Sequence, residues 1–291
     1  MIYPNNINVY INKICNLNCI YCYERKNDIT IDVDRSFQFN NFCYAIKKVN
    51  INNITITGGE PLKCNFVRKY IQRAKSQGIQ VALLTNGTLK LDFDIIRMIS
   101  GVTFSVDGNE DIMKKHRGIN NMISIYENIQ ACIKENCNIN INCVVTKFNL
   151  FNFEEGLLKI LNISHIEKSL KAIRINAVDI EQTTIALNKQ EQQILIERIY
   201  SFAKQVAYKI IISTNLVNKK HFELSGSKQC FKYPIWFDLS TEKYFISKED
   251  QYDSIEELIS RYIELNQRHL NSLLETINNN DIFIPAKGVQ L

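Results

Sequence analysis

The sequence lacks long apolar runs, and it has only four prolines, ten glycines and one tryptophan among its 291 residues. No segment approaches the roughly 18 to 20 apolar residues of a membrane-spanning helix. The N-terminus has neither a basic region nor an apolar stretch, so we expect no secretory signal and a cytoplasmic location. Because 45% of the residues are apolar, a sizeable core can form, which excludes global disorder.

Charge of one sign is not concentrated anywhere in the chain. Its 35 Lys and Arg and 30 Asp and Glu give a net charge of +5, and the two signs are interspersed. We therefore expect neither a nucleic-acid nor a membrane partner. Nine cysteines without a secretory signal indicate reduced thiols or metal ligands rather than a disulfide framework.

The first 215 residues alternate short β-type runs with longer helical patterns, which indicates parallel βα units. Ligands of such sheets gather at the C-terminal ends of the strands. We expect strands at 8–11, 53–57, 80–84, 102–106, 139–145, 172–176 and 208–213, and helices at 34–49, 66–76, 93–99, 122–134, 154–161 and 189–206.

The pattern changes after residue 215. Residues 234–239 and 242–246 form two short β-type runs around a turn, which predicts a hairpin. A helix is expected over 253–277, with Asp253 or Ser254 as its cap. We therefore divide the chain into a core over 1–215 and a C-terminal extension over 216–291.

Three cysteines, Cys15, Cys19 and Cys22, lie within eight residues directly after the first strand. Three thiolates on one loop can bind three irons of a 4Fe–4S cluster and leave the fourth iron open. A structural zinc site needs a fourth Cys or His, and the nearest histidine in the sequence is His116. Three unrelated buried thiols are the alternative, which the density of this triplet disfavours.

With Tyr21 as its aromatic residue, this triplet resembles the signature of the radical S-adenosylmethionine superfamily. Gly58, Gly59 and Glu60 follow the second strand and are similar to the motif that holds the methionyl ammonium group in that family. Two glycines let the backbone approach a ligand closely, and a carboxylate accepts hydrogen bonds from an ammonium group.

Further motifs resemble the peptide-modifying branch of the superfamily: residues 85–87, 105–108 and 116–118. The resemblance implies that Tyr21 shields the cluster and that Ser105 and Arg117 bind the carboxylate or ribose of S-adenosylmethionine; Asn176 is a further candidate. The alternatives are a surface ion pair for Arg117 and a plain Asp-Gly turn after Ser105. We identify no partner for His116 and expect a structural role.

The resemblance implies an α/β fold, a partial (β/α)6 TIM-like barrel with a small C-terminal hairpin-plus-helix extension. It also implies a 4Fe–4S cluster and S-adenosylmethionine as cofactors. The reduced cluster would split the sulfonium to give a 5′-deoxyadenosyl radical, which takes a hydrogen atom from the substrate. The implied partners are an electron donor such as flavodoxin or ferredoxin, a precursor peptide and a separate peptide-recognition protein. We expect no leader-binding domain before residue 8, so either that protein or the C-terminal region would have to recognise the peptide.

Cys230 precedes the predicted hairpin, which resembles the start of a SPASM or twitch extension. Such extensions bind auxiliary clusters, but Ser247 stands where the second cysteine is expected. Because one thiol cannot hold a cluster, we predict a degenerate extension without auxiliary metal. Cys230 is then either a buried thiol or a hydrogen-atom donor, as a thiol is in peptide epimerases of the superfamily.

The remaining cysteines are expected in the core, and the spacing of three of them is discounted as a second cluster motif because their side chains should point in different directions. These residues are Cys43, Cys64, Cys132, Cys137 and Cys143.

The leading hypothesis is a radical enzyme that matures ribosomally made peptides. One alternative is an enzyme of the same superfamily that acts on a small molecule or a nucleotide. A glycyl-radical activating enzyme fits less well, because the resemblance there is confined to the cysteine loop. A non-catalytic iron–sulfur carrier or sensor is the alternative of another class, and the motif at 58–60 argues against it.

Overall fold

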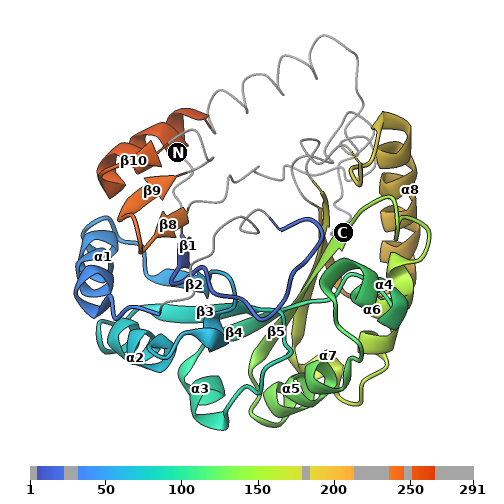
Figure 1. Ribbon diagram of the computed structural model, residues 1–291, viewed down its shortest axis with the longest axis horizontal. Helices are drawn as coiled ribbons and strands as arrows, with labels where there is room; N and C mark the ends of the chain where they lie inside the picture. Colours follow the sequence, from blue (N-terminus) through green and yellow to red (C-terminus); the bar gives the residue numbers. More distant parts are fainter. Residues whose placement is uncertain (1–4, 23–31, 179–183, 213–235, 246–250, 266–291) are drawn as a thin grey trace.

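Parallel strands form the centre of the molecule, and helices surround them on the outside (Figure 1). The structure, a computed structural model, describes residues 5–22, 32–178, 184–212, 236–245 and 251–265. Seven strands pair in chain order, each parallel to the next, which confirms the α/β barrel-like class. The strands are β1 (Ile7–Tyr10), β2 (Asn53–Thr57), β3 (Gln80–Thr85), β4 (Gly101–Ser105), β5 (Asn138–Val145), β6 (Leu170–Ala177) and β7 (Lys209–Ile212).

The helices connect these strands across the outer face of the sheet, as right-handed βα crossovers require. Local signals begin and end several of them. Asn188 and Glu191 form a capping box at the start of α8, and the left-handed Gly118 ends α4. The helices are α1 (Ser36–Lys48), α2 (Val67–Ser76), α3 (Phe93–Met98), α4 (Glu110–Arg117), α5 (Ile123–Lys134), α6 (Phe153–Leu161), α7 (Ile166–Ser169) and α8 (Lys189–Gln205), with a 3-10 turn, η1, at Pro61–Lys63.

The two faces of the strands differ in polarity. Residues such as Phe104 and Ile141 are fully buried under the helices and form the main core. The alternate residues, such as Thr103 and Asn142, are only half-buried and face the barrel interior. The interior of this barrel is therefore lined largely by hydroxyl and amide groups.

The C-terminal hairpin is confirmed, and it extends the barrel sheet. Strands β8 (Trp236–Asp238) and β9 (Lys243–Phe245) are antiparallel, and β10 (Gln251–Tyr252) pairs with β9. Strand β8 lies parallel to β1, with Asn8 opposite Trp236. Phe237 stacks on Phe42 of α1, with ring centroids 4.5 Å apart. The sheet is thus open, with β10 at one edge and β7 at the other in the part of the chain that the structure describes.

Most predicted elements are present, with boundaries that differ from the prediction by at most two residues. The predicted terminal helix is seen over 255–265, where Ser254 accepts a hydrogen bond from the Glu257 N–H, and its remainder lies outside the described residues. The sequence interpretation missed α4, α7 and β10. The division at residue 215 also falls outside the described residues and stays a prediction.

Candidate active site

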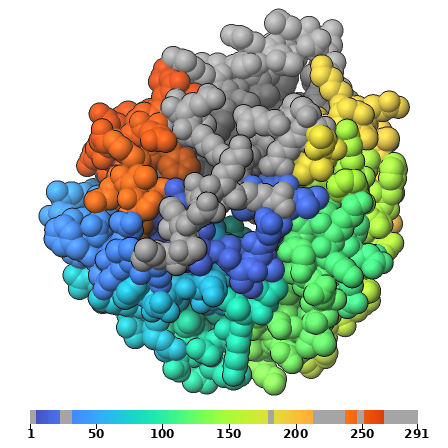
Figure 2. Space-filling view, in the orientation of Figure 1, coloured from blue at the N-terminus to red at the C-terminus, as the bar shows by residue number. Residues whose placement is uncertain are grey.

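A cavity of about 340 Å³ lies where the strands end, within the size range of ligand pockets. Figure 2 shows the dark blue N-terminal segment at the centre of the visible face, beside the orange hairpin. The cavity brings together nine of the predicted site residues, namely Cys15, Cys19, Tyr21, Cys22, Gly58, Gly59, Ser105, Arg117 and Asn176. Glu60 is not among its lining residues, and Cys230 lies outside the described part of the chain.

The cysteine loop follows β1 and turns back on itself. The Leu17 N–H donates to the sulfur of Cys15 at 3.4 Å, and the Cys22 N–H donates to the carbonyl of Cys19 at 3.1 Å. Burial raises the pKa of the Cys19 thiol to about 11, although the nearby Arg117 lowers it. Burial also raises the pKa of Cys15. Metal binding at this loop would therefore release protons.

The donor set fits an iron–sulfur cluster. Three thiols of one loop line the cavity, and no carboxylate or imidazole is among the described lining residues. Among the described residues, no three Cys, His, Asp or Glu side chains are arranged to hold a single metal ion. A 4Fe–4S cluster does not need three ligands around one ion, because each thiolate binds a different iron atom.

Gly58 and Gly59 have a second reason to be glycine, which the sequence interpretation missed. A Cβ on Gly59 would overlap the carbonyl of Ile14, and one on Gly58, where φ is +148°, would overlap the carbonyl of Asn12. The Gly59 N–H donates to Asn12 at 3.0 Å, and the Glu60 N–H donates to Ile14 at 2.7 Å. The glycines thus let the backbone before the cysteines pack directly on the end of β2.

The Glu60 carboxylate is buried and bonded within the protein. Its oxygens accept from the Thr85 hydroxyl at 2.8 Å, the Asn86 N–H at 2.8 Å and the Leu62 N–H at 3.1 Å. Burial raises its pKa, and these hydrogen bonds oppose the increase. Glu60 therefore ties the end of β2 to the end of β3, and its role toward an ammonium group stays a prediction.

Asn86 connects the ends of β2 and β3 to the cysteine loop. Its amide nitrogen lies 3.0 Å from Oδ1 of Asn16 and 3.9 Å from the sulfur of Cys15. The motif at 85–87 was noted in the sequence, but this contact could not be read from it. Asn176 is held similarly at the other side of the cavity, where its amide donates to Asn142 at 2.6 Å.

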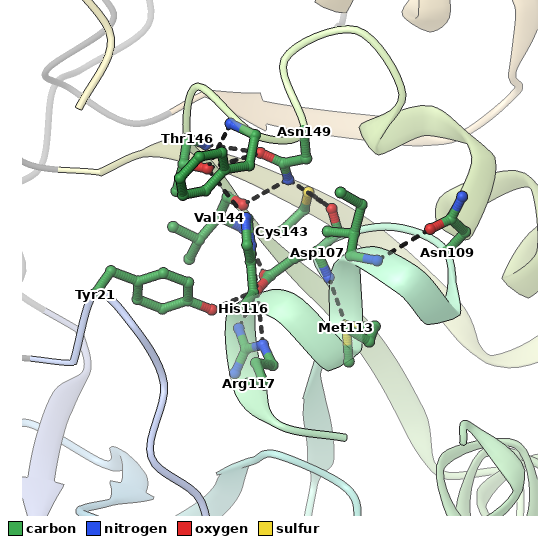
Figure 3. Close-up of polar contacts among 12 residues, drawn as sticks. Tyr21, Asp107, Asn109, Met113, His116, Arg117, Cys143, Val144, Thr146 and Asn149 are labelled. Atoms are coloured by element: carbon green, nitrogen blue, oxygen red, sulfur yellow. Dashed lines mark hydrogen bonds and ion pairs between the residues drawn. The ribbon is translucent and has the colours of Figure 1, made fainter. Parts of the chain in front are cut away.

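Asp107, at the end of β4, is the centre of a buried polar network (Figure 3). Arg117 donates to its two carboxylate oxygens through Nε at 2.8 Å and Nη2 at 2.9 Å. The Tyr21 hydroxyl and the Val144 N–H, at 2.9 Å, donate to the same carboxylate. Nδ1 of His116 lies 3.3 Å from it. We call Tyr21, Asp107, His116 and Arg117 the Asp107 network.

Within the Asp107 network, Asp107 and Arg117 form a charged pair. Burial alone would raise the pKa of Asp107, but Arg117 and His116 hold it well below the usual range of a carboxyl group. Asp107 likewise keeps the pKa of Arg117 above its ordinary value in spite of burial. A bidentate, fully enclosed pair of this kind is geometrically specific.

Residues outside the Asp107 network hold its members in place. Nε2 of His116 lies 3.0 Å from the Thr146 hydroxyl, and the Asn149 amide donates to the Asp107 carbonyl at 2.7 Å. His116 therefore has partners, contrary to the sequence interpretation. Arg117 is not in a surface ion pair, and Asp107 is not part of a plain turn. The missed signals were Asn109 and Gly118, which cap the helix that carries His116 and Arg117.

The remaining described cysteines are buried, as expected. One detail differs. Cys132 and Cys137 are hydrogen-bond partners. The turn after α5 brings Cys137 back beside the last turn of that helix, which contains Cys132. The expectation that all three side chains diverge was therefore wrong for this pair. Cys143 lies apart, with its sulfur 3.7 Å from the Asp107 carbonyl.

The model of the Radical SAM superfamily matches residues 9–155, about half of the chain, and thus spans the cysteine loop, the glycine motif and the Asp107 network. The chain belongs to the radical SAM superfamily. A 4Fe–4S cluster and S-adenosylmethionine are the cofactors of this family, as predicted.

Known proteins resemble different parts of the radical SAM chain. GTP 3′,8-cyclase of Clostridium perfringens is 26% identical over 162 residues, which are 52% of this chain and 49% of that protein. SuiB of Streptococcus suis, bound to its precursor peptide SuiA, has a TM-score of 0.65 at 13% identity, with 84% of this chain and 60% of SuiB covered. For anSMEcpe with bound AdoMet and the Kp18Cys peptide, the TM-score is 0.63 at 16% identity, with 84% and 74% covered.

The radical SAM chain spans about half the length of the curated relatives it matches. The structural likenesses establish the fold alone, since the identities are low. No helix among the described residues is both long enough and apolar enough to cross a membrane.

Proposed function

We propose that this chain is a radical SAM enzyme that removes a hydrogen atom from a peptide and so matures it. The observation that carries the proposal is the convergence of the cysteine loop, the glycine motif and Arg117 on one cavity. When bound, the cluster and S-adenosylmethionine would supply the radical that attacks an unactivated carbon. The protein binds these groups, orients them and excludes water.

Each part of the chain has a task in this proposal. Cys15, Cys19 and Cys22 bind the cluster, while Tyr21 shields it. Gly58, Gly59 and Glu60 form the ammonium subsite for the methionyl group. Ser105, Arg117 and Asn176 line the remaining part of the cavity and are the candidates for the carboxylate and ribose.

The character of the lining favours a peptide. Its polar side chains are mostly neutral amides and hydroxyls, which can exchange hydrogen bonds with peptide groups; they include Thr57, Asn86, Ser105 and Asn142. Arg117 is the one cation among the described lining residues, and Asp107 already engages it. The structures of SuiB with its precursor peptide and of anSMEcpe with the Kp18Cys peptide lend further support.

Nucleotide modification is the second candidate, because GTP 3′,8-cyclase is among the relatives. A triphosphate would require cationic side chains that the described lining does not supply. The proposed partners of the peptide enzyme are an electron donor such as flavodoxin or ferredoxin, a precursor peptide and a separate peptide-recognition protein.

The deciding experiment is anaerobic reconstitution with iron and sulfide, followed by dithionite and S-adenosylmethionine. We expect formation of 5′-deoxyadenosine, which peptides encoded beside the gene stimulate while changing mass, and which Cys19→Ser abolishes. Stimulation by GTP instead of peptide would favour the nucleotide reaction. A chain that binds the cluster but makes no 5′-deoxyadenosine would be a carrier or sensor.

Cys230 is the proposed hydrogen-atom donor to the substrate radical. Replacing it with alanine should stop formation of the peptide product and leave cleavage of S-adenosylmethionine intact, because the thiol acts after the radical has reacted. Mass spectrometry of the peptide and chromatography of 5′-deoxyadenosine measure the two steps. Cys43→Ala, at a buried thiol of α1, is the control, and unchanged product formation by Cys230→Ala would refute the role.

A further inference from the structure

The segment between the second and third cysteines is held at two consecutive residues. The Ile20 N–H donates to the carbonyl of His116 at 2.8 Å. The hydroxyl of Tyr21 donates to Asp107. Both contacts reach across the barrel opening from the cysteine loop to α4 and the end of β4. The positions of Cys19 and Cys22 relative to each other therefore depend on groups about 90 residues further along the chain.

Asp107 is the residue that organises this contact. Its Oδ2 accepts from the Tyr21 hydroxyl and from Nε of Arg117, and its Oδ1 accepts from Nη2 of Arg117 and the Val144 N–H. With its side chain fully enclosed, the carboxylate has no freedom to reorient. Tyr21 can therefore donate in only one direction.

The same carboxylate also controls charge beside the loop. The guanidinium carbon of Arg117 lies 5.4 Å from the centre of the Tyr21 ring, and its positive charge acts on Cys19. Asp107 opposes this charge by direct pairing with Arg117. The electrostatic environment of a cluster at the loop is thus that of an ion pair rather than of a free cation.

We propose that Asp107 is a positioning residue for the cluster: through Tyr21 and Arg117 it holds the loop from Cys15 to Cys22 in its cluster-binding conformation and balances the charge beside it. Loss of outer-shell partners weakens metal sites about 10- to 100-fold. The net charge around an iron–sulfur cluster, together with hydrogen bonding, sets its reduction potential. The proposal therefore makes two separate predictions.

The test uses the full chain with its cluster reconstituted anaerobically and needs no substrate. In Asp107→Asn, an iron chelator should remove the cluster about 10- to 100-fold faster than in the wild type. The midpoint potential of the remaining cluster, measured by EPR titration, should be more positive, because Arg117 is no longer neutralised. Tyr21→Phe, which keeps the ion pair, should also lose the cluster faster, though less so.

Matched controls are available. Asp111→Asn changes an exposed carboxylate on α4, the helix that carries Arg117, and Tyr126→Phe removes a hydroxyl from a half-buried tyrosine of α5. The proposal fails if Tyr21→Phe or Asp107→Asn loses its cluster no faster than its control, or if Asp107→Asn keeps the wild-type midpoint potential. Should Asp107→Asn not fold, the chelation rate of Tyr21→Phe decides. Because no peptide is present, these results are independent of the proposed substrate.

Discussion

Arg117→Met should lower the free energy of unfolding by about 3–5 kcal/mol, the cost of breaking a buried ion pair from one side. The substitution removes both hydrogen bonds from the guanidinium to Asp107 and leaves the carboxylate in a site with no exposure to solvent. The Tyr21 hydroxyl, the Val144 N–H and Nδ1 of His116 remain beside the carboxylate, but none of them replaces the two hydrogen bonds of the charged guanidinium group. Denaturant unfolding of the cluster-free chain measures the effect.

Two further variants separate charge from shape. Arg117→Lys keeps the charge but cannot form the two parallel hydrogen bonds of a planar guanidinium group, so an intermediate loss is expected. In the double variant Asp107→Asn/Arg117→Met no charge is buried, and part of the lost stability should return. If Arg117→Met unfolds at the wild-type denaturant concentration, the pair does not stabilise this fold.

Gly59→Ala should displace the cysteine loop. The new Cβ would overlap the backbone carbonyl of Ile14, the residue before Cys15, and neither backbone segment can move without breaking the hydrogen bond from Gly59 to Asn12. Overpacking at such a site costs about 1–3 kcal/mol. We expect a comparable loss in unfolding free energy together with a sharp fall in iron and sulfide content after reconstitution.

Gly78→Ala is the matched control, because it has the opposite combination of properties. Gly78 has a φ of +72° and open space around it, whereas Gly59 does not have a positive φ. Alanine at 78 should therefore cost about 1–2 kcal/mol of backbone strain and leave the cluster content unchanged. Full cluster loading by Gly59→Ala would contradict the packing described here.

Local patterns were sufficient for much of the fold. The β-branched run at Asn53–Thr57 became β2 with the expected boundaries, because alternation and a following Gly-Gly pair define it locally. The pairing of β8 with β1 was not predictable in the same way, since a short hairpin carries no mark of which sheet edge it joins. Helix α4 was missed although Asn109 and Gly118 mark its ends.

In the candidate site, too, some features could be predicted from local sequence and others could not. The cysteine spacing and the Gly-Gly-Glu motif identified the residues that converge on the cavity. The sequence could not reveal that the Glu60 carboxylate bonds to Thr85 and Asn86, or that Asp107 joins Tyr21 to Arg117. Both facts depend on contacts between strand ends, which tertiary structure alone brings together.

The pairing of β1 with β8 has a consequence for how the chain acquires its shape. It joins residue 8 to residue 236, so the chain must be synthesised at least as far as residue 236 before this edge of β1 finds its neighbour. Contacts between such distant positions form slowly, and an uncovered strand edge is a template for association with other chains. One edge of the strand that leads into the cysteine loop therefore stays uncovered until β8 has been made, and other chains can pair with it until then.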